Sequence, residues 1–169
     1  MNISPRNISI STCGLVPELL RFTKEAPHVT LSVSLHAPND EIRNTVMPIN
    51  RRYPMGELLN AAKLYADETG RRVVFEYALI KGVNSSKKDA SELSQRLKGI
   101  NCHVNLIPLN HVEERNLMGV TRKDGERFAQ WLEGFGISAT VRREMGSDIE
   151  GACGQLRRKT LQGITEESR

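Results

Sequence analysis

The sequence has few cysteines and no long apolar run, and each shortage excludes a class of protein. Its three cysteines, Cys13, Cys102 and Cys153, are odd in number and widely spaced, which excludes a disulfide scaffold and a local CxxC metal motif. No stretch approaches the roughly 18 apolar residues of a membrane-spanning helix, and the first residues lack the apolar segment of a signal peptide. We therefore expect a cytoplasmic protein with reduced thiols and no membrane partner.

Several catalytic signatures are missing as well. There is no glycine-rich phosphate loop, no HExxH and no GxSxG, which excludes the commonest nucleotidases, proteases and esterases. The rest is ordinary for a soluble domain, because 169 residues with 38% hydrophobic and 26% charged side chains suffice for one real core. The net charge of +4 permits a polyanionic partner without identifying one.

Short β-branched runs alternate with longer amphipathic segments along the whole chain. The runs predict strands at residues 7–11, 30–35, 73–79, 103–109 and 137–142. Helices are predicted to begin at Pro17, at Pro54 as first helical residue with Gly70 at the end, after Ser86 as N-cap, and after Thr121, which with Asp124 resembles a capping box. This alternation predicts an α/β fold, in which repeated βα units form a parallel sheet with helices packed outside.

Polar residues gather where such folds place their sites, at the C-terminal ends of the predicted strands. Ser11 follows the first strand, Ser34 and His36 end the second, and Asn110 follows the fourth. Each side chain can bind a ligand or merely satisfy a turn or helix end, and the residues alone leave both interpretations open.

Cys153 is the thiol with the strongest functional signal. Its neighbours Gly151, Ala152 and Gly154 are small enough to let a bulky ligand approach the backbone. Cations nearby in the sequence would lower the pKa of the thiol. The alternative is a loop cysteine without a role.

Other candidates have simpler explanations. Cys13 and Cys102 border strands, where a free cysteine usually behaves as a small hydrophobic residue. Three basic pairs are most simply explained as solvated surface: Arg51-Arg52, Arg71-Arg72 and Lys87-Lys88.

Five short motifs, in this order, resemble one family. They are Ser11-Thr12-x-Gly14, the run SLHAPNDEIR from Ser34 to Arg43, Pro48-Ile49-Asn50, Asn105-Leu106-Ile107-Pro108-x-Asn110, and Ala152-Cys153-Gly154-Gln155-Leu156. The family consists of dual-specificity radical S-adenosylmethionine (SAM) methyltransferases, which methylate C2 of an adenine in 23S ribosomal RNA and in tRNA. The similarity covers nearly the whole chain.

The resemblance implies an enzyme built on a partial (βα)6 barrel. Residues 1–145 would form the later barrel units, and residues 146–169 a C-terminal segment with the methyl-carrier cysteine. SAM would be contacted by Ser11, by the strand end Ser34-Leu35-His36 and by Asn110. Cys153 would be the catalytic residue, methylated on sulfur by one SAM before a radical from a second SAM activates that methyl group for addition to adenine C2. An upstream cysteine outside this chain would then form a disulfide bond with Cys153.

The sequence lacks the family's CxxxCxxC loop, whose thiolates hold a [4Fe–4S] cluster, and its Gly-Glu-Pro strand. We therefore expect a fragment or a truncated gene product that is inactive alone. The intact enzyme would need the cluster, an electron donor and its partners 23S rRNA and tRNA, whose phosphates some of the basic pairs would contact. Two alternatives stay open: a related adenine-C8 rRNA methyltransferase, and a non-catalytic SAM- or RNA-binding module.

Overall fold

The computed structural model describes residues 4, 7–108 and 118–142, and these form one parallel sheet with its helices. The strands are β1 (Ser9–Thr12), β2 (Thr30–Ser34), β3 (Val73–Leu79), β4 (Cys102–Pro108) and β5 (Ala139–Val141). They pair in the order β1-β2-β3-β4-β5, each in parallel with the next. All five predicted strands are confirmed, with ends within two residues of the predicted ones.

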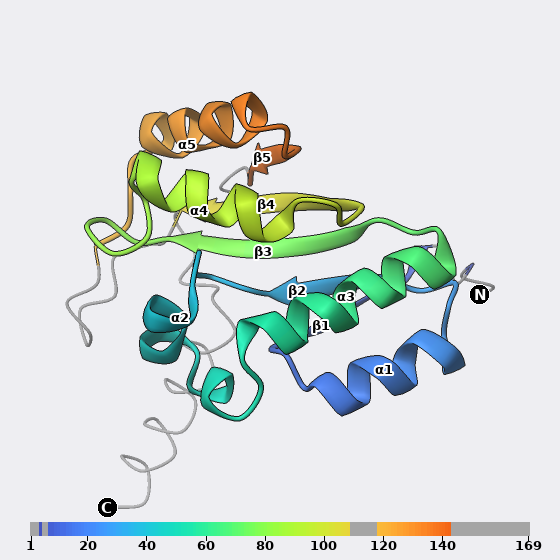
Figure 1. Ribbon diagram of the computed structural model, residues 1–169. Coiled ribbons are helices and arrows are strands. Elements are labelled where there is room, and N and C mark those ends of the chain that lie inside the picture. The colour runs from blue at the N-terminus through green and yellow to red at the C-terminus, as the bar shows by residue number, and fades with distance from the viewer. Residues whose placement is uncertain (1–3, 5–6, 109–117, 143–169) are drawn as a thin grey trace, which may run out of the picture.

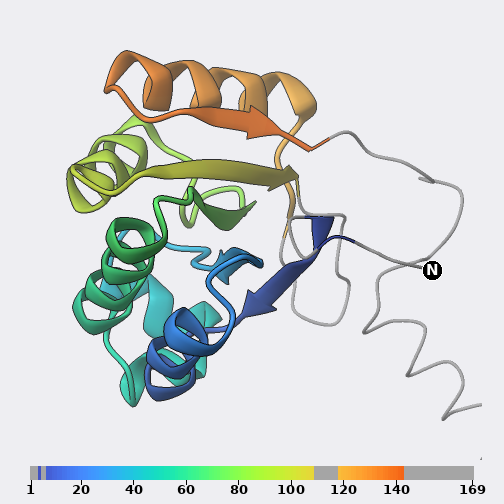
Figure 2. The same ribbon diagram turned by 90° about the vertical axis from the view of Figure 1, so that its right-hand side faces the viewer.

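The helices connect consecutive strands and cover one face of the sheet. They are α1 (Val16–Glu25), α2 (Asp40–Val46), α3 (Met55–Thr69), α4 (Lys87–Leu97) and α5 (Arg122–Gly134), with a 3-10 turn η2 (Pro48–Arg51) before α3. Figure 2 shows α1, α3, α4 and α5 on the same side of the strands. Neighbouring strands that are consecutive in sequence, with every crossover helix on one face, form the wall of a barrel and not a doubly wound sheet. The predicted α/β fold is confirmed.

Most of the helix signals act as predicted, with one correction. The Ser86 hydroxyl accepts from the N–H of Asp89 at 3.2 Å, and the Asp89 carboxylate accepts from the N–H of Ser86 at 2.8 Å, which completes a capping box. Gly70 ends α3 in the left-handed conformation, with φ 66°. Pro54 is wrongly predicted as the first helical residue of α3: its ψ of 155° is extended, so it is the N-cap.

The sequence pattern did not predict α2 and the 3-10 turn. α2 has seven residues, too few for a helical period to show. Its N-cap is Asn39, whose side chain accepts from the N–H of Ile42 at 2.9 Å. Figure 1 shows α2 and the turn on the side toward which the strands point, so both belong to the C-terminal edge of the sheet.

The apolar core lies between the sheet and the helices. Alternate strand residues face it and are at most 1% exposed: Leu31, Val33, Phe75, Tyr77, Val104 and Leu106. No helix in the described part of the chain has the length and apolarity needed to cross a membrane. Residues 143–169 lie outside the described part, so the proposed division at residue 145 stays a prediction.

Candidate functional site at the C-terminal edge of the sheet

The sheet face that carries no helix in the described part of the chain is lined with polar side chains. The register places Ser11 beside Ser32, Ser34 beside Glu76, and Glu76 beside Asn105. The Asn105 amide donates to the Glu76 carboxylate at 3.0 Å. Hydroxyl, amide and carboxylate groups are costly to bury without partners, so this row suits a polar ligand better than an apolar core. We call these five residues the open face.

The structure brings Ser11 and Ser34 to adjacent strands of the open face. Ser11 is exposed and Ser34 is half-buried, so both hydroxyls are accessible from the same side. Leu35 differs, because its side chain is fully buried in the core. The N–H of Leu35 donates to the carbonyl of Glu76 at 3.0 Å, so this residue would approach a ligand only through its backbone.

His36 has an unusual backbone conformation for a residue other than glycine, with φ 58°. Three hydrogen bonds hold it: its Nδ1 accepts from the N–H of Ala78 at 3.0 Å, its carbonyl accepts from the Asn84 amide at 2.8 Å, and its N–H donates to the carbonyl of Glu76 at 3.3 Å. Burial, assisted by the charge of Arg43, lowers the pKa of the imidazole to about 4. The ring is therefore neutral at physiological pH, and because Nδ1 accepts, its proton is on Nε2.

Asn84 is a site residue that sequence reasoning missed. It is fully buried, and its side-chain amide also donates to the carbonyl of Ala78 at 2.8 Å. Its Oδ1 accepts from the N–H of Ile80 at 2.7 Å, so Asn84 joins the end of β3 to His36 after β2. It lies in a turn-like run between a strand and a helix cap, which indicates a surface loop and gives no sign of burial.

Arg43 is the second missed residue, although it stands within a quoted motif. Its guanidinium is completely buried. Nε donates to the carbonyl of Leu35 at 3.1 Å, and Nη2 donates to the carbonyls of Cys13 at 2.9 Å and Ser34 at 3.1 Å. Nη1 donates to the Asn50 side chain at 2.8 Å. One side chain therefore holds the C-terminal ends of β1 and β2 in a fixed relation.

Asn50 extends this arrangement into the 3-10 turn. Its amide donates to the Asp40 carboxylate at 2.8 Å and to the Asn44 side chain at 2.9 Å. The same Asp40 oxygen accepts from the N–H of Met55 at 2.7 Å, where α3 begins. Burial acts to raise the pKa of Asp40, but the hydrogen bonds from Met55 and Asn50, together with the charges of Arg96 and Arg43, lower that pKa overall. We call Arg43, Asn50 and Asp40 the Arg43 network.

The structure gives a steric reason why residue 14, in the first motif, is a glycine. Its φ is 114°, a conformation that side chains rarely allow. A Cβ atom there would lie 3.2 Å from Nη2 of Arg43 and 3.2 Å from Cδ2 of Leu58. Only glycine lets the chain leave β1 over the buried guanidinium.

Two predicted site residues, Asn110 and the catalytic Cys153, lie outside the described residues, so their places stay predictions. Cys13 is exposed, so the expectation that it packs as a small hydrophobic residue is wrong. Cys102 packs against the core, and burial raises the pKa of its thiol to about 11. Among the described residues, no group of three or more His, Cys, Asp or Glu could hold a metal ion, so they do not fit an iron–sulfur cluster.

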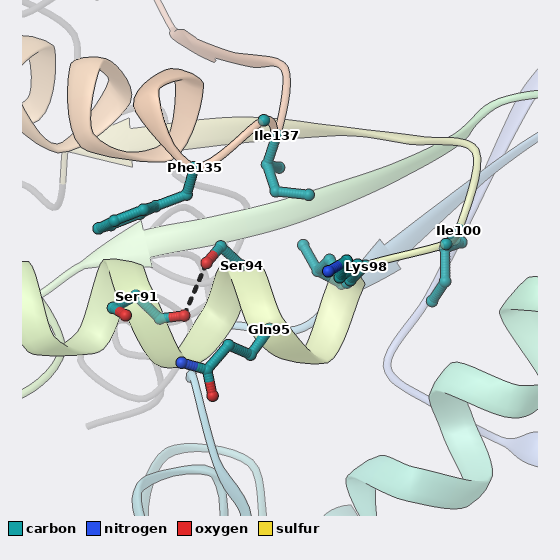
Figure 3. Close-up of a pocket in the computed structure, with 10 residues that line it drawn as sticks. Ser91, Ser94, Gln95, Lys98, Ile100, Phe135 and Ile137 are labelled. Carbon is teal, nitrogen blue, oxygen red and sulfur yellow. Dashed lines mark hydrogen bonds between the residues drawn. The ribbon is translucent and has the colours of Figure 1, made fainter.

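A cavity of about 460 Å³ lies away from this site, between the ends of α4 and α5 (Figure 3). Its lining includes Ser94, Lys98 and Phe135, and none of the predicted site residues. The polar strand ends, and not this cavity, are therefore the candidate site.

Known proteins resemble this chain in sequence. Residues 2–94 match the family described as the radical SAM superfamily. A protein of Thermoanaerobacter sp. (strain X514), named "Probable dual-specificity RNA methyltransferase RlmN", is 53% identical over 161 residues, which are 95% of this chain and 47% of that protein. A protein of the same name from Pelotomaculum thermopropionicum is 54% identical over 160 residues, 94% of this chain and 44% of that protein. The chain thus spans about half the length of the curated relatives it matches.

Solved structures resemble it as well. The crystal structure of a radical SAM methyltransferase from Sphaerobacter thermophilus has a TM-score of 0.87 and 52% identity, and covers 92% of this chain and 46% of that one. A domain of pyruvate-formate lyase-activating enzyme from Bacteroides vulgatus has a TM-score of 0.59 at 18% identity, with 80% of each chain covered. The second likeness shows the fold alone.

Proposed function

The chain belongs to the radical SAM superfamily, and from this membership we propose that it is the SAM-binding and methyl-carrier part of an RNA methyltransferase. The substrate would be C2 of an adenine in 23S rRNA and in tRNA, as the resemblance of the five motifs implies, and the names of the relatives support an RNA methyltransferase of dual specificity. The observation that carries the proposal is that Ser11, Ser34 and His36 come to one edge of the sheet, at strand ends that the buried Arg43 holds together.

The open face has groups that suit SAM. This molecule presents ribose hydroxyls, a carboxylate and an ammonium group, which need both hydrogen-bond donors and acceptors. Ser11 and Ser34 supply hydroxyls that do either, and neutral His36 supplies an Nε2–H donor. The Glu76 carboxylate supplies an acceptor on the same face.

Cys153 would carry the methyl group. C2 of adenine is an electron-poor aromatic carbon, so it does not displace a methyl group from SAM directly. A thiolate does: the sulfur of Cys153 attacks the methyl carbon, the bond from that carbon to the sulfonium breaks, and S-adenosylhomocysteine leaves. The described residues do not fit a [4Fe–4S] cluster, so we assign no step on them to such a cluster or to its electron donor. The chain's own part is to bind SAM and position its methyl group.

The test uses the full-length protein that carries this chain, reconstituted without oxygen and incubated with SAM and either 23S rRNA or tRNA. Mass spectrometry of the digested RNA is expected to show 2-methyladenosine. The variant Cys153→Ala is expected to abolish it while SAM binding, measured by calorimetry, persists. Unchanged RNA methylation by Cys153→Ala would overturn the carrier role, 8-methyladenosine would move the target atom to C8, and SAM binding without any methylated RNA would favour a binding module.

A further inference from the structure

The structure separates the basic pairs of the sequence by the edge of the sheet on which they lie. Arg51 ends the 3-10 turn and Arg52 follows it, at the C-terminal edge that carries Ser34 and His36 (Figure 1). Arg71 and Arg72 immediately precede β3, so they lie at the opposite edge. A substrate that reaches the strand ends therefore passes the first pair and not the second.

We propose that Arg51 and Arg52 form a phosphate-binding contact that holds the RNA backbone beside the SAM site. This inference rests on the proposed function, in which RNA is the substrate. RNA affinity comes largely from cations that neutralise phosphates, and RNA is recognised through its backbone as well as its bases. Two adjacent guanidinium groups beside a ligand site match this chemistry. This contact would orient the RNA without reading its sequence.

The charges of this pair are available to a ligand. Both side chains are exposed, and none of the ion pairs found in the described part of the chain includes either of them. Three acidic groups on the same edge are already bound: the carboxylates of Asp40, Asp89 and Asp124 accept from Asn50, Ser86 and Thr121. These three acids are engaged at helix starts, whereas Glu41 and Glu57 on the same edge are exposed like the two arginines, and no ion pair of the described residues joins them to Arg51 or Arg52.

The backbone that carries the pair is also tied to the strand ends. Asn50, directly before Arg51, accepts from the buried Arg43 at 2.8 Å, and Arg43 in turn donates to the carbonyl of Ser34. The Arg52 guanidinium lies 5.4 Å from the centre of the Tyr53 ring, within the range of a cation–π contact. A phosphate bound here would therefore lie on the edge of the sheet that carries the proposed SAM site.

The other pairs lack this combination. Arg71 donates to the Thr30 hydroxyl at 2.9 Å, which gives it a structural role. Lys87 and Lys88 begin α4 at the C-terminal edge and are exposed, but neither is next in sequence to a residue of the Arg43 network. Only Arg51 and Arg52 adjoin the Arg43 network.

The test compares two double variants with the same change of charge in the full-length protein. Arg51→Glu with Arg52→Glu reverses the proposed contact. Arg72→Glu with Lys98→Glu reverses two exposed cations at the opposite edge. Binding of labelled tRNA is measured by fluorescence anisotropy at several salt concentrations, and SAM binding by calorimetry.

We expect the first variant to bind tRNA roughly tenfold more weakly at low salt, with a salt-dependence slope reduced by about 1 to 2, because two phosphate contacts are lost. The control variant is expected to change affinity less than about twofold, and SAM binding is expected to be unchanged in both. Equal losses in the two variants, or no loss in the first, would overturn the contact. Circular dichroism checks folding, and if the first variant does not fold, Arg51→Gln with Arg52→Gln takes its place, with the same slope change expected.

This result is distinct from failure of the proposed function. If the unaltered protein neither binds nor methylates RNA, the function fails. If it methylates RNA and the Arg51 and Arg52 variants behave as the control, only the contact fails.

Discussion

On the helix-covered face of the sheet, β3 buries Phe75 and Tyr77 completely, whereas on the open face the same strand carries the half-buried Glu76, which accepts a hydrogen bond from Asn105. The covered face has few polar groups to offer a ligand, whereas the opposite face carries the polar residues of the open face beside Val74, Ala78 and Ile107, which the register places among them. We conclude that stability depends mainly on one face and ligand binding on the other. Substitutions on the two faces are therefore expected to change different measurements.

The largest effect is expected in the core. Phe75→Ala removes a fully buried ring that packs between sheet and helices, and large-to-small changes of this kind cost about 3–5 kcal/mol of unfolding free energy. Urea denaturation followed by circular dichroism measures it. Val74→Ala, the neighbouring position on the opposite face, is the control, with a cost of about 1 kcal/mol or less. Similar costs at both positions would remove the distinction between the faces.

Arg43 is expected to affect both stability and ligand binding, because it is buried and also holds the strand ends of the candidate site. Arg43→Met leaves three backbone carbonyls and the Asn50 side chain without their donor, and is expected to cost about 3 kcal/mol of unfolding free energy. It is also expected to weaken SAM binding under conditions where the variant is folded. Arg43→Lys keeps the charge but loses the planar fork, so an intermediate loss is expected. Normal SAM affinity in a folded Arg43→Met variant would contradict the positioning role.

His36 is expected to make the free energy of unfolding depend on pH. The folded state holds its pKa at about 4, below the ordinary 6.5, so between these values the unfolded chain binds a proton that the folded chain does not. The contribution of this group to the free energy of unfolding is therefore complete above pH 6.5 and is lost as the pH falls toward 4, by about 3 kcal/mol.

The matched control for this pH effect is His36→Asn. Asparagine tolerates positive φ, and its side-chain oxygen can accept from the N–H of Ala78, but it does not titrate. Unfolding is measured by urea denaturation at several pH values between 4 and 7. Identical pH profiles for the two proteins would contradict the prediction.

The smallest effect on stability is expected on the open face. Glu76→Gln keeps the shape of the side chain and leaves an oxygen that can accept from Asn105, so the unfolding free energy is expected to change by less than about 1 kcal/mol. SAM affinity, measured by calorimetry, is expected to fall severalfold because a carboxylate has been lost from the ligand face. Glu68→Gln, an exposed position on α3, is the control, and equal SAM affinity in both variants would exclude Glu76 from the site.

Much of the fold could be predicted because its signals are local. Alternation of apolar and polar residues placed β2, β3 and β4, and Ser86 placed the start of α4. The same alternation, applied to Ser11 and Ser34 at strand ends, placed them where the structure has them.

The site residues that the sequence did not predict depend on contacts between distant segments. Arg43 lies in a short polar helix and resembles a solvated arginine until the carbonyls of Cys13 and Ser34, at the ends of two strands, converge on it. Asn84 resembles a loop residue for the same reason, since its partner His36 is far away in sequence. The positive φ of His36 follows from those tertiary bonds, and no local pattern encodes it.

The shared guanidinium of Arg43 has a mechanical consequence. Because its nitrogen atoms bind the ends of both β1 and β2, a molecule that displaces one strand end strains the bonds to the other. A compound that touches only Ser11 is therefore expected to shift the amide resonances around His36 as well. The ends of β1 and β2 therefore move together, because the buried guanidinium of Arg43 joins them.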